Sequence, residues 1–187
     1  NKVLRKAYKN WDEYAFFGYL KKLSIPESKP FGDFSRGMKM KLGIAAALSH
    51  NSKLLILDEA TSGLDPVVRD EVVELFSDFT RDEEHSVLIS SHIVSDLEKL
   101  CDYIAFLHQG RLMLCEEKDA LLAEYCFARG TASELDAIDR SNVIGRRDGR
   151  YGSEAIVRRA AAPAGLSLSP VSIEELFIFM VKEGGRQ

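Results

Sequence analysis

The alternation of hydrophobic and polar positions divides the chain into helices and strands. In residues 1–50, apolar side chains recur at three-residue steps before the breaker Ser24-Ile25-Pro26, and this spacing predicts a helix. The positions in this stripe are Trp11, Tyr14, Phe17, Leu20 and Leu23. An Ala- and Leu-rich stretch that starts at Met38 predicts a second helix, which ends before the polar residues 50–52.

Two short apolar runs predict buried parallel strands. Residues 53–57 and 86–90 are continuous rather than alternating, as in strands that are covered on both faces. Between them, Asp65 before Pro66 predicts the N-cap and first turn of a helix. The apolar face of that helix consists of Val68, Val72, Leu75, Phe76 and Phe79. A short helix with Ile93, Leu97 and Leu100 follows the second strand, and this order of elements predicts parallel α/β winding.

The remainder of the chain changes character. The run "YIAFLHQGRLMLC" predicts two strands around a turn at Gln109-Gly110. From about residue 116 a helix with Leu121, Leu122 and Tyr125 precedes a Gly- and Arg-containing stretch at 140–152. A capping-box pattern at 172–175 starts a last helix, whose apolar face holds Ile173, Leu176, Phe177 and Met180. We therefore divide the chain into parts 1–50, 51–118 and 119–187.

Composition narrows the class of protein. The 187 residues are 45% hydrophobic and 29% charged, which is ordinary for a globular protein. The length fits one domain, or one domain plus a small appendage. The net charge of −4 does not indicate a nucleic-acid binder, although residues 1–50 carry ten Lys and Arg against four Asp and Glu. This basic segment fits a surface that faces phosphates or lipid headgroups, and it fits a merely solvated surface at least as well.

The three cysteines show no CxxC spacing, so they predict neither a disulfide framework nor a zinc site and fit a reducing cytosol. No apolar run reaches the roughly 18–20 residues of a membrane span, and no signal peptide opens the chain. From these features we expect a soluble protein.

Candidate chemistry lies after the two predicted parallel strands. Asp58 and Glu59 follow the first, and Ser91 and His92 follow the second. Because ligands of open parallel sheets bind beyond the carboxyl ends of the strands, two carboxylates and an imidazole are expected at one edge. The first acid is placed to hold a hydrated Mg²⁺, the second to deprotonate a water, and the imidazole to contact a terminal phosphate. Taken singly, each of these residues is weak evidence for a catalytic site. Strands often end in acids, and a lone histidine is more often a capping or packing residue than a catalytic one.

The whole constellation is more specific. The stretch "FSRGMKMKLGIAAALSHNSKLLILDEATSGLDP", followed by "VLISSH" and "CDYIAFLHQGRLM", closely resembles the ATPase subunit of ABC transporters from about residue 11 to residue 125. The resemblance implies an α/β fold of the P-loop NTPase (RecA-like) class. It assigns 1–50 to a helical subdomain with the signature motif, 51–118 to half of the ATPase core, and 119–187 to a small α+β C-terminal extension.

The resemblance also implies roles. Asp58 becomes the magnesium-side acid of the Walker B motif, and Glu59 the catalytic base. Asp65, in the D-loop "SGLD", lies at a dimer interface. His92 is the switch histidine that senses the γ-phosphate of ATP.

The signature motif, usually LSGGQ, is "FSRGM" here. In the family this loop contacts ATP held by the opposite subunit, which assigns that contact to Ser35 and Gly37. A helix start suits phosphate because its N–H groups are free. Arg36 and Met38 replace the usual glycine and glutamine, and Ala60 stands where proline is common. Arg36 either adds a charge-assisted contact or points to solvent, and we favour solvent.

Two motifs of the family have no match in the 187 residues. None of the thirteen glycines lies in a GxxxxGK[ST] pattern, and no glutamine fits the Q-loop. Both motifs belong before residue 1 in the family order, so we expect this chain to be the C-terminal part of a longer ATPase. Alone, it should bind MgATP poorly or not at all.

The function implied is ATP hydrolysis with Mg²⁺ by a head-to-tail dimer of ATPase subunits on the inner face of the cell membrane. A separate transmembrane permease would use this energy for transport, most like the ABC-2 class of exporters, and no nucleic acid is expected as a partner. Two alternatives remain. One is a soluble ABC ATPase without a transport role; the other is a non-enzymatic module that docks onto an intact ATPase and lends it the signature motif.

Overall fold

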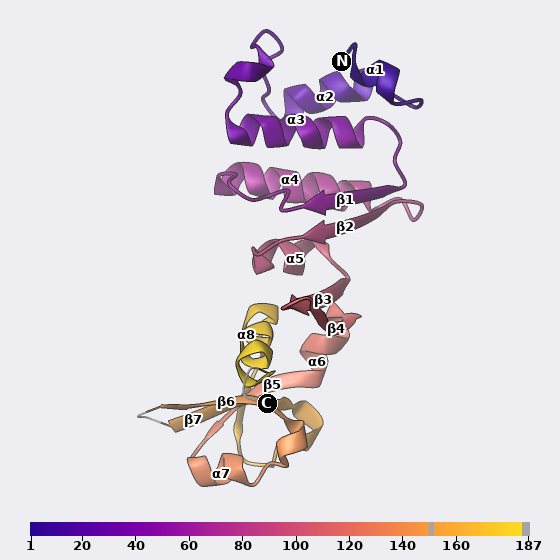
Figure 1. Cartoon of the computed structure of the whole chain (residues 1–187). Coiled ribbons are helices and arrows are strands. Elements are labelled where there is room, and N and C mark those ends of the chain that lie inside the picture. The colour runs from indigo at the N-terminus through magenta and orange to yellow at the C-terminus, as the bar shows by residue number, and fades with distance from the viewer. Residues whose placement is uncertain (150–151, 185–187) are drawn as a thin grey trace. The chain divides into compact units, whose positions relative to one another are not determined.

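The computed structural model of the chain describes residues 1–149 and 152–184 (Figure 1). It consists of two compact units, Asn1–Leu100 (unit 1) and Cys101–Gln187 (unit 2). The three parts at 1–50, 51–118 and 119–187 are defined by motif content rather than by compactness, so they stay a prediction.

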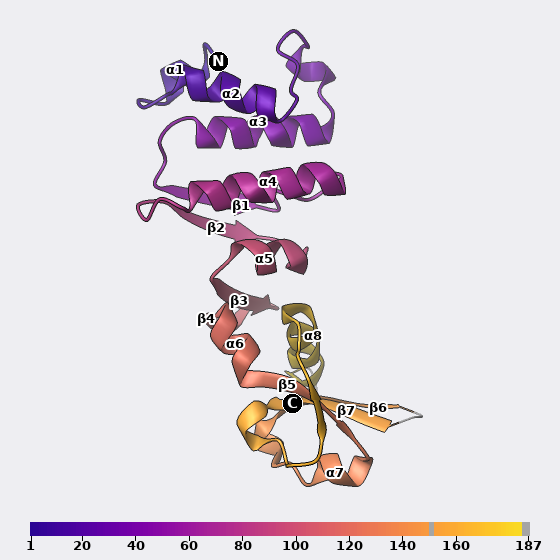
Figure 2. The same cartoon turned by 180° about the vertical axis from the view of Figure 1, so that it is seen from behind.

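Unit 1 opens with helices α1 (Leu4–Ala7), α2 (Glu13–Lys22) and α3 (Arg36–Leu48) and the short 3₁₀ helix η1 (Phe31–Asp33). Asp12 caps α2, because its carboxylate accepts from the Ala15 amide at 2.9 Å. Figures 1 and 2 show α2, α3 and α4 (Pro66–Phe79) lying one after another from both sides of the molecule. The helical start of the chain is therefore confirmed.

The predicted apolar stripe at three-residue steps is wrong in its middle. Tyr14 is 93% exposed and Phe17 is 36% exposed, whereas Phe16, Leu20 and Leu23 are buried. An α-helix has 3.6 residues per turn, so positions spaced by three drift around the helix and cannot all share one face.

The α/β part of unit 1 follows the prediction closely. Strands β1 (Leu54–Asp58) and β2 (Ser86–Ser90) are parallel, with Leu54 opposite Ser86 and Asp58 opposite Ser90. Helix α4 follows β1 and α5 (Val94–Leu100) follows β2, and residues from α3, β1 and α4 share one hydrophobic core.

Only one face of this strand pair is covered within the described residues. Leu55 is buried, and Leu57, Val87 and Ile89 pack against the core. On the opposite face, the exposed fractions are 50% for Leu54, 72% for Ile56 and 62% for Leu88. The prediction that both faces are covered is therefore wrong for the described residues. A continuous apolar run is nevertheless the sequence pattern of a parallel strand that has helices on both faces.

Unit 2 begins with an antiparallel hairpin of β3 (Tyr103–His108) and β4 (Arg111–Glu117). Its turn is at Gln109-Gly110, as predicted, and both residues have positive φ, 48° and 75°. Two such residues in a row are typical of a type I′ hairpin. Helix α6 (Lys118–Glu124) follows, and Tyr125, which the pattern placed on that helix, instead begins the next strand.

A second sheet forms the rest of unit 2, with strand order β6-β7-β5-β8. Its strands are β5 (Tyr125–Gly130), β6 (Val143–Gly149), β7 (Gly152–Arg158) and β8 (Ser167–Ser169). The helices around it are α7 (Ala132–Asp136), η2 (Arg140–Asn142), η3 (Arg159–Ala161) and α8 (Ile173–Gly184). The stretch 140–152 thus contains β6 and the start of β7, while Arg150 and Tyr151 lie outside the described residues.

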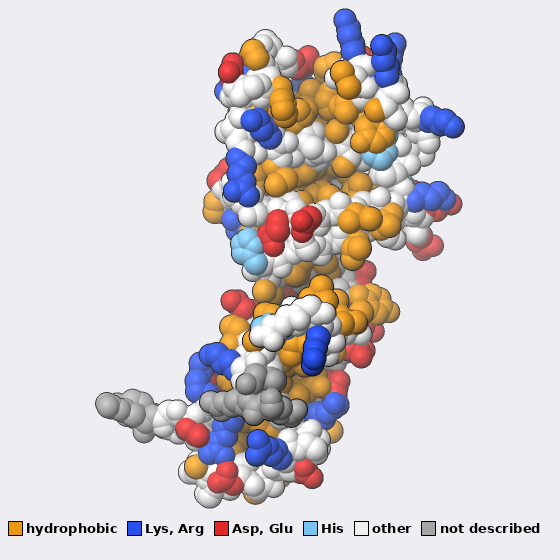
Figure 3. All heavy atoms as spheres, in the orientation of Figure 1, with side chains coloured by type: hydrophobic (Ala, Val, Ile, Leu, Met, Phe, Trp, Pro, Cys, Tyr) orange, Lys and Arg blue, Asp and Glu red, His pale blue; other side chains and the backbone are white. Residues whose placement is uncertain are grey.

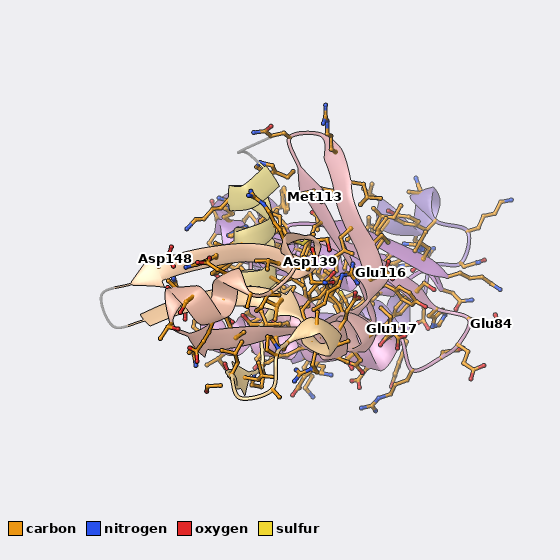
Figure 4. The ribbon with its side chains drawn as sticks, turned by 90° about the horizontal axis from the view of Figure 1, so that it is seen from below. Glu84, Met113, Glu116, Glu117, Asp139 and Asp148 are labelled. Atoms are coloured by element: carbon orange, nitrogen blue, oxygen red, sulfur yellow. The ribbon has the colours of Figure 1, made fainter. Side chains whose placement is uncertain are left out.

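The sheet of unit 2 has a core on each face. Leu135 and Ile138 pack with Cys126 and Val157 on one face. On the other face, Phe179 of α8 meets Phe127 of β5, with ring centroids 5.7 Å apart. The capping box that starts α8 is confirmed, since the Ser172 and Glu175 side chains each accept from the other's amide. Figure 4 labels Glu116 and Glu117 on β4 and Asp148 on β6, all of them exposed. Over the described ranges, no helix is long and apolar enough to cross a membrane.

Candidate functional site

The candidate site lies at the carboxyl ends of β1 and β2. Parallel pairing sets Asp58 opposite Ser90, and the Ser90 hydroxyl donates to Asp58 Oδ1 at 2.5 Å. The next amide, that of Glu59, donates to the Ser90 carbonyl at 3.0 Å. The two strand ends are therefore tied together, and the carboxylate of Asp58 is held at the edge of the sheet.

Glu59 and His92 are brought into direct contact. Glu59 has a left-handed backbone, with φ of 50°, as the chain leaves β1. Its Oε2 lies 2.6 Å from Nδ1 of His92, which follows β2. A ring N–H at Nδ1 donates this hydrogen bond, so Nε2 of a neutral His92 is left as an acceptor. The predicted base and the predicted phosphate sensor thus form one pair.

The pair is open to solvent rather than enclosed. The side chain of His92 is 69% exposed and that of Glu59 is 40% exposed. In Figure 3, acidic side chains and a histidine lie together on the surface of unit 1, next to a hydrophobic area. A ligand can therefore reach Asp58, Glu59 and His92 from one side.

Asp58 suits a hydrated cation. One of its oxygens accepts from Ser90, and the described residues contain no group of three or more His, Cys, Asp or Glu that could hold a metal ion. Mg²⁺ keeps several waters and is often bound by one carboxylate plus the phosphates of its substrate. The donor set fits Mg²⁺ bound through water at Asp58, with phosphate oxygens as the other ligands.

The signature segment starts α3. The Ser35 hydroxyl accepts from the Met38 amide at 3.2 Å, so Ser35 is the N-cap of a 13-residue helix. A Cβ on Gly37 would meet Leu64 Cδ2 at 3.6 Å, which places the segment beside the D-loop of the same chain. Within the described residues, no hydrogen bond joins Ser35 or Gly37 to the Asp58, Glu59 and His92 group.

The D-loop is a turn that leads into α4. Gly63 has φ of 75°, and a side chain there would be strained even though there is space for it. Asp65 Oδ1 accepts from the Val68 amide at 3.1 Å, which confirms the predicted N-cap. The Arg69 guanidinium donates to the Leu64 carbonyl at 3.2 Å, so the loop is held from two sides.

Sequence reasoning missed Ser90, the residue that orients Asp58. The signal was available, because two apolar runs of equal length in parallel register bring their last residues opposite each other. It also missed Asp96, the one residue of α5 that is buried, where the pattern emphasised Ile93, Leu97 and Leu100. A buried acid on an amphipathic helix has no periodic signal of its own.

Comparison with known proteins supports the resemblance to ABC ATPases. A family profile described as "AAA domain, putative AbiEii toxin, Type IV TA system" matches residues 27–95. The chain is 45% identical over 93 residues to the lantibiotic transport ATP-binding protein SrtF of Streptococcus pyogenes, covering 50% of this chain and 40% of SrtF. Over the matched residues, the chain is similar to part of an ABC-type ATPase. It is also 46% identical over 85 residues to the bacitracin transport ATP-binding protein BcrA of Bacillus licheniformis, covering 46% of this chain and 28% of BcrA.

A third relative matches more of this chain. The ABC transporter ATP-binding protein YtrB of Bacillus subtilis is 32% identical over 123 residues, which is 66% of this chain and 42% of YtrB. The chain therefore spans about two fifths, or less, of the length of these ABC ATPases.

Solved structures give the same fold. The ATP-binding cassette MJ0796, in a dimer bound to ADP and Pi, has a TM-score of 0.50 at 20% identity, over 54% of this chain and 44% of that one. A structure of an ATP binding subunit of an ABC transporter has a TM-score of 0.50 at 29% identity, over 58% of this chain and 46% of that one. The fold class expected from the sequence, a P-loop NTPase of the ABC type, is confirmed.

Proposed function

We propose that this chain supplies the Walker B, D-loop and H-loop part of an ATP-binding subunit that powers an ABC transporter. The observation that carries the proposal is the Glu59–His92 hydrogen bond, formed beside Asp58 at the carboxyl ends of two parallel strands. This arrangement of a base, an imidazole and a metal-side acid is suited to phosphoryl transfer to water.

Glu59 acts as the general base. Its Oε2 is held by His92, while Oε1 makes no hydrogen bond with the described residues and is free to accept a proton from water. Holding one oxygen orients the other, which lowers the cost of placing the attacking water. With Nδ1 bound to Glu59, Nε2 of His92 is the ring atom that contacts the terminal phosphate when it carries a proton.

Asp58 takes the magnesium side of the site. Ser90 fixes the carboxylate through Oδ1, and Oδ2 would hold a water of the hydrated Mg²⁺. The metal, when bound with ATP, neutralises charge on the phosphates.

The signature segment serves the ATP of a second subunit. The first N–H groups of α3 and the hydroxyl of Ser35 can donate to phosphate oxygens, and Gly37 lets the backbone approach. Among the described residues, no hydrogen bond joins Ser35 or Gly37 to the Glu59–His92 pair. A head-to-tail dimer would bring the signature segment of one subunit to the ATP that is bound beside the Glu59–His92 pair of the other. In such a dimer, Asp65 lies at the interface.

The names of the relatives support the proposed partners. SrtF and BcrA are named for lantibiotic and bacitracin transport, which favours an exporter of the ABC-2 class with a separate permease. The subunit would then lie on the inner face of the cell membrane. We expect no nucleic acid among its ligands, and the 187-residue chain alone should hydrolyse little ATP.

The test is ATP hydrolysis by the protein expressed from its full reading frame. Glu59→Gln is expected to reduce kcat about a hundredfold or more, the scale of a lost general base. ATP binding is expected to persist, and the closed dimer to accumulate with ATP. Glu71→Gln, which removes an exposed acid of α4, is the matched control and should leave turnover unchanged.

Turnover near wild type in Glu59→Gln would overturn the assignment of the base. An absence of hydrolysis in the wild-type protein, together with binding to an intact ABC ATPase, would instead support the docking-module alternative. Purification with a permease separates the transporter subunit from a soluble ABC ATPase.

A further inference from the structure

Two charged side chains of unit 1 have buried atoms without a hydrogen-bond partner. Among the described residues, Nε of Arg69 and Oδ2 of Asp96 are both in this state. Asp96 is only 5% exposed. Burying part of a charge without a partner is costly, so a second charge of opposite sign is expected nearby.

The two residues lie on helices that pack together. Arg69 is on α4 and Asp96 is on α5, and the next residue of α4, Asp70, forms an ion pair with Lys99 of α5 at 2.6 Å. Asp96 and Lys99 are three positions apart and share a face of α5. The pKa of Lys99 is raised, first by its hydrogen bond with Asp70 and by the charge of Asp70, and also by the charge of Asp96.

Each residue also connects to a different catalytic loop. Arg69 donates to the Leu64 carbonyl at 3.2 Å, directly before Asp65 of the D-loop. Asp96 is in the first turn of α5, and its amide donates to the Ile93 carbonyl at 3.1 Å, directly after His92. A link between the two side chains would therefore join the D-loop to the segment that carries His92.

We propose that Arg69 and Asp96, which make no direct ion pair in this structure, are paired through one buried water that ties the D-loop to the start of α5. Guanidinium suits this role because its planar fork donates in several directions, so one arm can hold Leu64 while Nε serves Asp96. The proposed pair is argued from the burial of the two atoms and the packing of the two helices, without reference to ATPase function. Its consequence, that Arg69 and Asp96 are positioning residues for Asp65 and His92, rests on the proposed ATPase function.

A double-mutant cycle on the 187-residue chain tests the pair. The chain contains a single tryptophan, Trp11, which packs against the core of unit 1, so its fluorescence follows the urea unfolding of this unit. Arg69→Met and Asp96→Leu are each expected to lower the urea midpoint, because each leaves the other charge buried alone. The double variant is expected to lower it no further than Arg69→Met does.

Additive shifts in the cycle would overturn the pair, since independent sites add. The matched control is the cycle of Asp70→Asn and Lys99→Met, an exposed pair on the same two helices for which near-additive, small shifts are expected. If the Met and Leu variants do not fold, Arg69→Gln and Asp96→Asn form a second cycle with the same criterion.

The positioning role is tested separately in the protein from the full reading frame. Arg69→Met and Asp96→Asn are expected to lower kcat about threefold to thirtyfold while KM for ATP is retained, and Arg69→Lys to restore only part of kcat. Unchanged kcat in both variants would show that the pair is only structural. A wild-type protein without hydrolysis would count against the proposed function and leave the urea cycle to decide the pair.

Discussion

At the scale of single residues, the backbone of Glu59 is the feature that needs an explanation. It is one of four non-glycine residues with positive φ among the described residues, and it is the one that carries candidate chemistry. Such a conformation costs about 1–3 kcal/mol and persists where the surroundings impose it. Here the left-handed turn after β1, together with the amide bond from Glu59 to the Ser90 carbonyl, directs the carboxylate toward His92.

Glycine at this position should relieve the strain of the left-handed backbone. We expect Glu59→Gly to be more stable than Glu59→Ala by about 1 kcal/mol, because both lose the carboxylate but only glycine tolerates positive φ. Urea unfolding followed by Trp11 measures the difference.

In the control, the glycine variant is expected to be the less stable of the two. Glu71 lies within α4, where Glu71→Gly should be less stable than Glu71→Ala by about 1 kcal/mol. Equal stability of the two Glu59 variants would mean that the left-handed turn stores no strain.

At the scale of elements, Asp65 has two separable roles. Its carboxylate caps α4 through the Val68 amide, and the family resemblance also assigns it to a dimer interface. Asparagine caps a helix about as well as aspartate does, whereas alanine does not cap.

We therefore expect Asp65→Ala to lower the free energy of unfolding by about 1 kcal/mol and Asp65→Asn to change it by a few tenths at most. Urea unfolding of unit 1 is the measurement. Ser62→Ala, in the same loop but outside the cap, is the control. A stability loss in Asp65→Asn as large as in Asp65→Ala would show that the charge itself, rather than capping, stabilises α4.

At the scale of the whole molecule, the charges of unit 2 give the chain a dependence on acid. The pKa of Glu154 lies below its usual value of 4.5, chiefly because Arg147 donates to its carboxylate, with Arg129 as a second donor. The pKa values of Glu134, Asp139 and Asp148 are lowered too, by hydrogen bonds from Thr131, from Ser141 and from Ser153 with Arg146, respectively. A folded state that binds these protons less tightly than the unfolded state loses stability on acidification.

Stability from Glu154 is thus fully present above pH 4.5 and is lost as the pH falls through the lower, folded-state pKa. The buried thiol of Cys126, on β5 of the same sheet, reports on the unfolding of unit 2. A disulfide reagent that is active in acid reacts with this thiol once unit 2 unfolds. The midpoint is the urea concentration at which half of the Cys126 thiol has become reactive, and it can be compared at pH 7 and below pH 4. Glu154→Gln is expected to lower this midpoint at pH 7 and to reduce its fall in acid. Glu174→Gln, at an exposed position of α8, is the control. If the urea midpoint of Glu154→Gln fell in acid as much as that of the wild-type protein, Glu154 would not be a source of the acid sensitivity.

Much of unit 1 and of the candidate site was determined by the sequence itself. The strands at β1 and β2, the caps of α4 and α8, and the turn at Gln109-Gly110 depend on neighbouring residues, so local patterns carry them. The cap of α3 was not predicted, because the helix starts at Arg36 rather than at the expected Met38. The position of Asp58, Glu59 and His92 at one sheet edge also follows, because parallel strands present their carboxyl ends together.

Only the tertiary structure decided the rest. That Phe16 is buried while Tyr14 is exposed depends on which side of α2 meets α3, and the bond from Ser90 to Asp58 depends on strand register. The sheet of β5 to β8 joins segments distant in the chain, and the buried atoms of Arg69 and Asp96 come from two packed helices. These features arise from contacts between residues far apart in sequence, and no local pattern of hydrophobic and polar positions encodes such contacts.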